Sequence, residues 1–257
     1  MTSRTTDWWD TLRVAEAPAD APAAFCADLG AESLLAAYRA GLFPMPAPDE
    51  YARWMNEALY EDRVASGAIA VPGGAGELPY QVSWWSPDPR PVIRPDQARL
   101  GRRLAQRLRN RLDWCTSVDR DFGRVVSQCA ADREPRWLTE DLRRGLLALH
   151  ERGRAHSVEV WQGTELVGGA FGIRVGPVLS LDSMFHRRPD ASRVAVADLA
   201  NRFGAVGGLL LDAQWDSSHI RSLGALPVSR QHYLDLLRGG PAADPPPIDL
   251  LPAARLT

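Results

Sequence analysis

The sequence contains no lysine: all 30 basic residues among its 257 are arginine. Each cationic contact is therefore made by a planar guanidinium group, whose several donors suit carboxylates and phosphates. Cysteine is scarce, and Cys26, Cys115 and Cys129 lie far apart with no C-x-x-C pair. This pattern excludes a disulfide framework and a zinc knuckle, and it fits a reducing compartment. The five histidines show no metal-ligand spacing, so we expect no metal site.

Long apolar runs are missing as well. No run approaches the roughly 20 residues that a bilayer-spanning helix needs. No apolar core follows Arg4 at the start of the chain, which excludes a signal peptide. We therefore expect a cytoplasmic protein without membrane insertion. The sequence also lacks the pattern G-x-x-x-x-G-K-S/T, so we expect no ATP site.

What is present is the composition of an ordinary globular protein. Hydrophobic residues make up 45% of the chain and charged residues 24%, with a formal net charge of −2. The length suits one large domain or two small ones, with a sizeable core.

Charge is distributed unevenly along the chain. Residues 1–62 hold eleven acids and four arginines, a local sum of −7, whereas residues 90–111 hold eight arginines and one acid, a sum of +7. The basic block predicts either a surface that follows phosphates or a solvated helix face neutralised by the acidic segment. Charge alone does not decide between the two.

Hydrophobic spacing and turn residues predict a mixed α/β fold. Helices are expected at 31–38, 48–62, 97–111, 142–152, 192–205, 217–223 and 229–238. Strands are expected at 156–161, 166–175, 178–185 and 209–211. Gly168, Gly169 and Gly172 lie inside a strand pattern, which favours close backbone packing over a phosphate-binding loop. The order of helix, antiparallel strands, helix, strand and helix is typical of an α/β layer built on a mixed sheet.

Several short motifs follow one another in a characteristic order. They are Tyr38-Arg39-Ala40-Gly41-Leu42-Phe43-Pro44, Trp84-Trp85-Ser86-Pro87-Asp88-Pro89-Arg90, Trp137-Leu138, His156-Ser157-Val158-Glu159-Val160-Trp161, Asp182-Ser183-Met184-Phe185 and Asp212-Ala213-Gln214. With these motifs the chain resembles the leucyl/phenylalanyl-tRNA–protein transferases, from about residue 26 to residue 237.

The resemblance implies a small N-terminal domain and a C-terminal domain shaped like an N-acetyltransferase core (GNAT-like). The corresponding ranges are 1–94, with an arm at 1–25 and an insertion at 46–83, then 95–238 for the catalytic domain. An extended proline-rich tail would occupy 239–257. The implied activity moves leucine or phenylalanine from tRNA to the N-terminal Arg or Lys of a protein, which marks that protein for bacterial proteolysis. The donor is an ester, so no cofactor is expected, and the family suggests a monomer.

The resemblance also assigns a reaction centre. Asp212 and Gln214 stand two apart at the end of an apolar strand, and alternation points both to one face. The hypothesis is that Asp212 binds or deprotonates the acceptor amine while Gln214 orients the amine and the ester oxygen. The alternative is an Asp that caps the next helix. Asp182, with Ser183, would face the cationic acceptor side chain, or else be a surface strand residue.

The donor sites follow by motif alignment. The aminoacyl and adenosine groups are assigned to Tyr38, Met45, Trp137, Ala170, Leu179, Met184, Leu199 and Phe203. Ordinary core packing is the alternative for Leu199 and Phe203. Arg99, Arg102, Arg103, Arg107 and Arg109 would contact tRNA phosphates.

Departures from the family keep three other functions open. Met45 replaces a Trp, Asp182 replaces a longer Glu, and Ala170 and Leu179 replace larger residues. These changes suggest a small-molecule amine as acceptor instead of a protein. An acetyl-CoA-dependent N-acetyltransferase would need a glycine-rich pyrophosphate loop, and residues 187–192 have no glycine. A tRNA-binding or N-terminus-binding module without catalysis is the third possibility.

Overall fold

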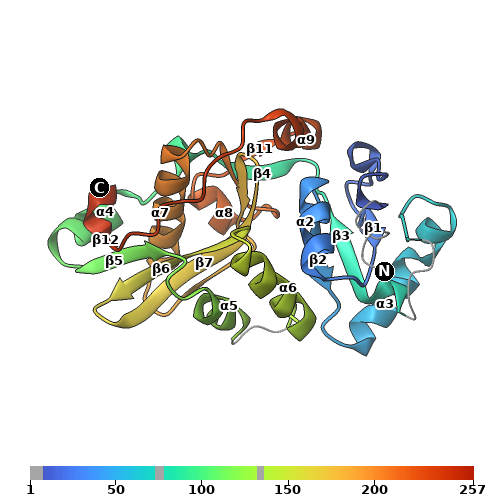
Figure 1. The fold of residues 1–257 in the computed structure, drawn as a ribbon, viewed down its shortest axis with the longest axis horizontal. Coiled ribbons are helices and arrows are strands. Elements are labelled where there is room, and N and C mark those ends of the chain that lie inside the picture. The colour runs from blue at the N-terminus through green and yellow to red at the C-terminus, as the bar shows by residue number, and fades with distance from the viewer. Residues whose placement is uncertain (1–7, 73–77, 132–135) are drawn as a thin grey trace.

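The computed structural model describes residues 8–72, 78–131 and 136–257. Two parts lie side by side along the long axis of the molecule (Figure 1). The smaller part is N-terminal and contains an antiparallel sheet ordered β1 (Ala24–Phe25), β3 (Val82–Trp85), β2 (Phe43–Pro46). Helices α2 (Ala31–Arg39) and α3 (Glu50–Ala65) accompany it.

The larger part is a mixed sheet ordered β11-β4-β10-β8-β7-β6-β5-β12, with β9 paired to β7. Its strands are β4 (Arg90–Ile93), β5 (Trp114–Val118), β6 (Ala155–Gln162), β7 (Glu165–Val175), β8 (Val178–Ser180), β9 (Ser183–His186), β10 (Leu210–Asp212), β11 (Leu226–Val228) and β12 (Leu251–Pro252). Among the described strands, β8 and β10 form the one parallel pair. The predicted mixed α/β class is confirmed.

Helices cover both faces of the large sheet (Figure 1). They are α4 (Arg102–Asn110), α5 (Phe122–Ala130), α6 (Glu140–Glu151), α7 (Ala191–Ala205), α8 (Ser218–Ser222) and α9 (Arg230–Gly239). A Cβ on Gly168 of β7 would meet Ala191 of α7 at 2.5 Å, and one on Gly169 would meet Val125 of α5 at 3.3 Å. Because successive strand residues point to opposite faces, α7 and α5 pack on opposite sides. The prediction that these glycines allow close packing is confirmed.

The helices expected at 31–38, 48–62, 142–152 and 192–205 are confirmed as α2, α3, α6 and α7. Thr139 is the N-cap of α6, where its hydroxyl accepts from the Leu142 amide at 3.4 Å. The basic helix begins at Arg102 instead of 97, because Pro95–Gln97 forms a 3-10 turn and Gly101 has φ +84°. Short helices α8 and α9 match those expected near 217–223 and 229–238.

The single strand expected at 178–185 is wrong, and its division matters for the site. Leu179 of β8 lies opposite Arg174, whereas Ser183 of β9 lies opposite Phe171. Between them the chain crosses Gly172, where a Cβ would lie 1.6 Å from the Ser180 carbonyl oxygen. The missing side chain therefore lets the segment after Ser180 turn out of the ladder, and Asp182 lies in that segment.

Both ends of the described chain are packed. Trp9, in the region expected as an arm, is fully buried; its indole donates to the Ser33 hydroxyl at 2.9 Å and its ring contacts Trp84 at 4.6 Å. The tail runs extended as expected and then pairs as β12 with β5. Residues 1–7 of the expected arm and 73–77 of the expected insertion lie outside the described ranges. Within those ranges, no helix is long and apolar enough to span a membrane.

Candidate active site

A cluster of polar side chains lies where β8 and β10 end. These strands run parallel, with Leu211 opposite Leu179 and Asp212 opposite Ser180. Their carboxyl ends therefore lie at one edge, and two residues beyond each strand come Asp182 and Gln214. The Gln214 carboxamide donates from Nε2 to Asp182 Oδ1 at 2.6 Å. The motifs Asp182-Ser183-Met184-Phe185 and Asp212-Ala213-Gln214 thus meet through Asp182 and Gln214.

Asp212 is fully buried, and both of its oxygens are occupied. Arg90 donates from Nε to Oδ1 at 2.8 Å and from Nη2 to Oδ2 at 2.6 Å. The Gln214 backbone amide donates to Oδ1 at 3.0 Å, and the Tyr233 hydroxyl donates to Oδ2 at 2.9 Å. A carboxylate has about four lone-pair positions, and four donors fill them here. The hypothesis that Asp212 itself binds or deprotonates the acceptor amine does not fit this geometry, because no position remains for an amine.

Arg90, which sequence reasoning did not single out as a site residue, joins the two parts of the molecule. Its guanidinium carbon lies 4.7 Å from the Phe43 ring centre and 4.6 Å from that of Tyr233, a cation–π contact on both sides. Burial alone would lower the pKa of Arg90, but the Asp212 carboxylate outweighs burial and raises the pKa above its usual value. The sequence does contain a signal for this role, because Arg90 is the first residue of the apolar strand Arg90–Ile93. A charge buried with such a strand requires a partner of opposite charge.

Gln214 occupies a strained turn. Its φ is +62°, and the Trp215 amide donates to the Ala213 carbonyl at 2.6 Å across it. This is the arrangement of a γ-turn with positive φ, which is rare and strained for a residue with a side chain. The turn directs the carboxamide toward Asp182 and the backbone amide toward Asp212. The strained turn therefore lets the single residue Gln214 bind both the Asp182 and the Asp212 carboxylates.

Asp182 differs from Asp212 in what it leaves open. Its Oδ2 is buried and has no hydrogen-bond partner among the described residues, and the same holds for the hydroxyl of the adjacent Ser183. Burial raises the pKa of Asp182 to about 7; the Ser180 and Tyr38 hydroxyls lower it, and the Asp212 charge raises it. Burial followed by the Asp182 charge holds the pKa of Tyr38 well above its usual range. Unpaired buried oxygens of this kind require an explanation, and a bound ligand is one.

The residues expected around the aminoacyl group fall into two clusters. Ala170, Leu179, Leu199 and Phe203 are fully buried in the core between the large sheet and α7, with Met184 packed against them at its margin. Tyr38 lies in a second, larger cluster that includes residues of both parts, and Met45 and Trp137 pack against that cluster. Five of the eight predicted residues therefore share one apolar core, and the other three belong to a different cluster.

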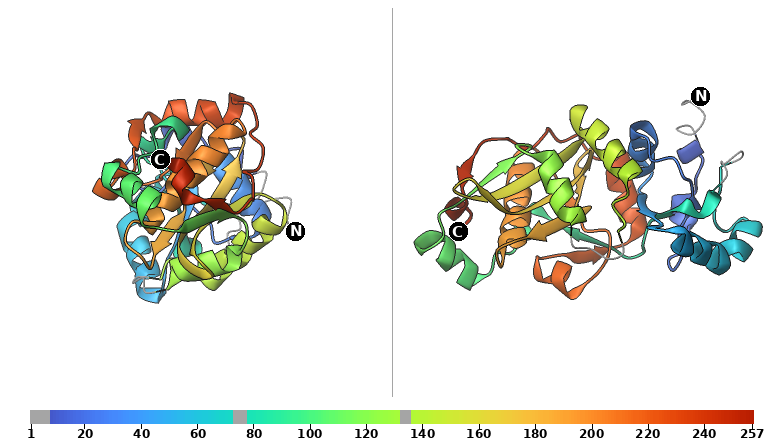
Figure 2. Two further views of the ribbon diagram at one scale, coloured as in Figure 1. Left: turned by 90° about the vertical axis from the view of Figure 1, so that its left-hand side faces the viewer. Right: turned by 90° about the horizontal axis from the view of Figure 1, so that it is seen from below.

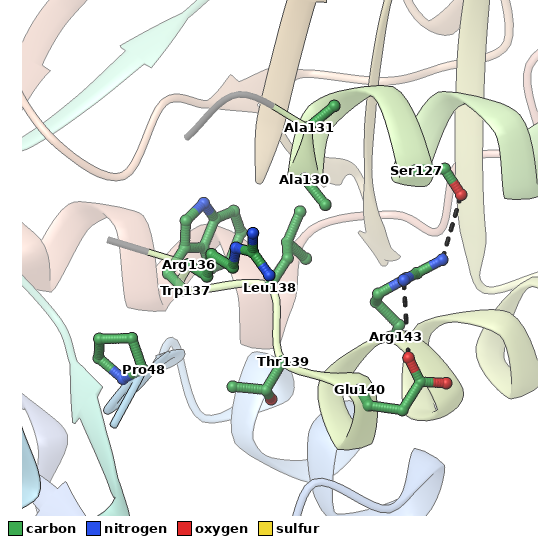
Figure 3. Close-up of a pocket in the computed structure, with 10 residues that line it drawn as sticks. All are labelled: Pro48, Ser127, Ala130, Ala131, Arg136, Trp137, Leu138, Thr139, Glu140 and Arg143. Atoms are coloured by element: carbon green, nitrogen blue, oxygen red, sulfur yellow. Dashed lines mark hydrogen bonds and ion pairs between the residues drawn. The ribbon is translucent and has the colours of Figure 1, made fainter. Parts of the chain in front are cut away.

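A cavity of about 740 Å³ lies beside Trp137 (Figure 3). It lies between Pro48 of the N-terminal part and the larger part, where Ala130 and Ala131 end α5 and Arg143 lies in α6. Arg143 is held in its wall by the Ser127 hydroxyl at 3.1 Å and Glu140 at 3.6 Å. Its volume is typical of a small-ligand site. Among its described lining residues are none of the Asp182, Asp212 or Gln214 cluster.

The predicted phosphate-contacting arginines lie on and before α4. Arg99, Arg102, Arg103 and Arg109 are exposed, whereas Arg107 is half-buried and pairs with Asp190 at 3.0 Å. Leu104 and Leu108 anchor the helix in the core. Four of the five arginines are therefore available at the surface, and the fifth is partly neutralised.

Comparison with known proteins agrees with the resemblance in the sequence. Residues 92–238 match the family model described as leucyl/phenylalanyl-tRNA protein transferase, and residues 27–55 match the model of its N-terminal domain. The leucyl/phenylalanyl-tRNA–protein transferase of Pseudomonas fluorescens (strain SBW25) is 37% identical over 214 residues, 82% of this chain and 81% of the relative. That of Proteus mirabilis is 42% identical over 154 residues, 60% of this chain and 66% of the relative.

Among solved structures, a GCN5-related N-acetyltransferase from Kribbella flavida is similar over 55% of both chains, at 13% identity and a TM-score of 0.35. A conserved protein of unknown function from Bacteroides thetaiotaomicron is similar over 84% of this chain and 90% of its own, at 13% identity and a TM-score of 0.40. Likeness at these TM-scores supports no functional statement. The family models and the relatives do: the chain belongs to the leucyl/phenylalanyl-tRNA protein transferase family.

Proposed function

We propose that the protein transfers leucine or phenylalanine from tRNA to the N-terminal Arg or Lys of an acceptor protein. Membership in the family supports the reaction class. The observation that carries the site is the pair of unpartnered oxygens, Asp182 Oδ2 and Ser183 Oγ, beside the Gln214 carboxamide. Together they offer acceptors to an ammonium or amine, as recognition of a free N-terminus requires.

The chemistry needs positioning and proton handling more than energy input. The aminoacyl ester is already activated, and an α-amine has a pKa near 8, so part of it is neutral at cellular pH. In this proposal Gln214 and Asp182 hold the amine next to the ester, and proximity supplies much of the acceleration. The buried Arg90–Asp212 pair holds the Gln214 turn in place, because Asp212 accepts a hydrogen bond from the Gln214 backbone amide.

The donor occupies the junction of the two parts. Trp137 offers an aromatic face to the terminal adenine, and the cavity beside it has room for a nucleoside. The Leu or Phe side chain lies against the margin of the apolar core that holds Ala170, Leu179, Leu199 and Phe203, where Met184 is only partly buried. The exposed arginines of α4 contact the tRNA phosphates, and a tRNA donor puts the reaction in the cytoplasm.

The test compares acceptors with a single donor. The protein is incubated with leucyl-tRNA and, separately, with an Arg-starting peptide, the same peptide starting with Ser, and simple amines. We expect a new amide on the α-nitrogen of the Arg peptide and less than a tenth of that yield with the Ser peptide. Product with the simple amines alone would show that the acceptor is a small molecule.

A further inference from the structure

We infer that the C-terminal tail, residues 240–257, positions the basic helix α4 for tRNA, and that Asp198 is the residue that fixes the tail. The inference rests on the proposed function, because it takes the exposed α4 arginines as tRNA contacts. The family model ends at residue 238, so the tail lies outside that match.

Helix α4 needs support from outside itself. It has nine residues, and isolated helices of fewer than about 12 residues are marginal in water. Its N-cap residue is Gly101, which has no side chain, and Arg102 and Arg103 put positive charge at the positive end of the helix dipole. Its buried residues are Leu104 and Leu108. The placement of the arginines therefore depends on what packs against these two leucines.

The end of the tail supplies that packing. Strand β12 pairs with β5, and the 3-10 helix η4 (Ala253–Leu256) then packs against α4. The C-terminus accordingly lies beside α4 in Figures 1 and 2. Ala253 is fully buried, and Leu256 packs against the apolar cluster that holds Leu104 and Leu108. A change in the path of the tail therefore moves the surface against which α4 packs.

Guanidinium groups hold the path of the tail. Four of its first eight residues are proline, whose nitrogen has no hydrogen to donate, so the tail forms few hydrogen bonds of its own. Its carbonyl oxygens accept from two buried arginines instead. Arg174 donates from Nη1 to the Ala243 carbonyl at 2.7 Å. Arg202 donates from Nη1 and Nη2 to the Pro247 and Asp249 carbonyls, at 2.7 and 2.8 Å.

Asp198 of α7 connects the middle of the tail to its end. Its side chain is fully buried, and Oδ2 accepts from Arg202 Nε at 2.8 Å. Its Oδ1 accepts from Nη2 of Arg255, a residue of η4 that also donates to the Thr116 hydroxyl of β5 at 3.1 Å. One buried carboxylate thus orients two guanidinium groups, each of which would lose its counter-charge without it. Asp198 is therefore a positioning residue, which acts on α4 through Arg255 and η4.

The first test measures the affinity of the whole protein for a labelled tRNA. The variants are Asp198→Asn, Arg255→Ala and the control Arg238→Ala, which removes the same charge from an exposed position in α9. Asp198→Asn removes a negative charge, so an effect of net charge alone would tighten binding of a polyanion. We expect Asp198→Asn and Arg255→Ala each to weaken binding at least fivefold, and the control to change it less than twofold. Unchanged or tighter binding by Asp198→Asn overturns the inference.

A combined variant separates positioning from direct contact with tRNA. Arg255→Ala is added to a protein in which Arg102, Arg103 and Arg109 are already replaced by Ala. The added substitution should then change the affinity less than twofold, because the contacts that the tail positions are gone. A further fivefold loss would mean that Arg255 itself contacts tRNA, and it would overturn the inference.

Transfer to an Arg-starting peptide separates positioning from a general loss of structure. The two donors are leucyl-tRNA and leucyl-adenosine, which has no phosphates for α4 to contact. In Asp198→Asn and Arg255→Ala, KM for leucyl-tRNA should rise at least fivefold with kcat changed less than twofold, and transfer from leucyl-adenosine should stay within twofold of the unaltered protein. An equal loss with both donors, in either variant, overturns the inference. No transfer by the unaltered protein overturns the proposed function instead, while the tRNA affinities still test the role of the tail.

Discussion

The Arg90–Asp212 pair is the residue-scale feature on which the site depends. Both side chains are almost completely excluded from solvent, so neither charge is tolerable without the other. Four further groups from separate segments of the chain contact the pair: the Gly41 carbonyl, the rings of Phe43 and Tyr233, and the Gln214 amide. The pair therefore holds the two parts of the molecule together and fixes the D-x-Q turn at the same time.

Breaking this pair should be severe. Arg90→Met leaves a buried carboxylate without its partner, and we expect a loss of about 3–5 kcal/mol in the free energy of unfolding, measured by urea denaturation. The control is Arg94→Met, four residues further on, where the exposed pair with Asp96 should contribute less than about 0.5 kcal/mol. Equal losses in the two variants would contradict the structural role given to Arg90.

Asp182 predicts a pH dependence of stability with an unusual sign for a carboxyl. The pKa of Asp182 is about 7 in the folded protein and near 4 in the unfolded chain. Between these two pH values the folded state therefore holds a proton that the unfolded state has lost. The contribution of this carboxyl group to the free energy of unfolding is thus largest below about pH 4, and it is lost as the pH rises to about 7. Asp182→Asn should raise the melting temperature at pH 8 but not at pH 4.5.

The measurement is the difference in melting temperature between the variant and the unaltered protein at the two pH values. Asp216→Asn serves as the control for the same change of residue at an exposed position nearby. A pH-independent difference for Asp182→Asn would mean that the carboxyl titrates alike in the folded and unfolded chain.

At the scale of elements, the site follows from how β7, β8 and β10 are arranged. The parallel β8–β10 pair brings two loop residues together, and Gly172 in β7 leaves the space through which the chain turns toward Asp182. The sequence predicted β7 and β10 and the helices around them, because their periodicity and turn residues are strong. It did not predict the break at Leu181–Asp182, because an apolar run reads as one strand unless the neighbouring strand is known.

Gly172→Ala tests this arrangement. The new Cβ would lie 1.6 Å from the Ser180 carbonyl, so β7 or the end of β8 must move. We expect a loss of about 1–3 kcal/mol in stability and a transfer rate reduced at least tenfold. Gly123→Ala in α5, where the nearest atom is a Leu147 methyl at 3.9 Å, is the control and should be neutral or slightly stabilising. A normal transfer rate in Gly172→Ala would show that the activity does not depend on the close contact between Gly172 and Ser180.

The same lesson holds for individual site residues. Asp182, Ser183 and Gln214 were predicted from ordered motifs and do lie together, whereas Arg90 and Tyr233 were missed. They approach Asp212 from β4 and α9, contacts between residues far apart in the chain that no local pattern records. The direct role expected for Asp212 does not fit its surroundings for the same reason, since only the structure shows its four donors.

At the scale of the whole molecule, acidic and basic segments lie at opposite ends of the long axis. The acidic N-terminal segment includes α3 at one end of the long axis, and the basic α4 lies at the other end (Figure 2). Such a separation of charge orients a polyanion before contact and raises its association rate. We therefore expect tRNA to approach along the α4 end of the larger part.

Replacing Arg102, Arg103 and Arg109 with Ala should weaken tRNA binding and flatten its salt dependence. Each phosphate contact adds about 0.7–0.9 to the slope of log affinity against log salt, so three lost contacts should reduce the slope by roughly 2–3. The control replaces Arg13, Arg144 and Arg152, which pair with acids away from α4. An unchanged slope in the α4 variant would remove this surface from the tRNA interface.

The most direct measurement exposes an Arg-starting peptide to the protein together with a pool of tRNAs charged with all amino acids, followed by mass spectrometry. We predict that the peptide gains the mass of leucine or phenylalanine at its α-nitrogen, and that Asp182→Asn nearly abolishes the gain. A peptide that stays unmodified, or that receives amino acids without preference for large apolar side chains, would contradict the account.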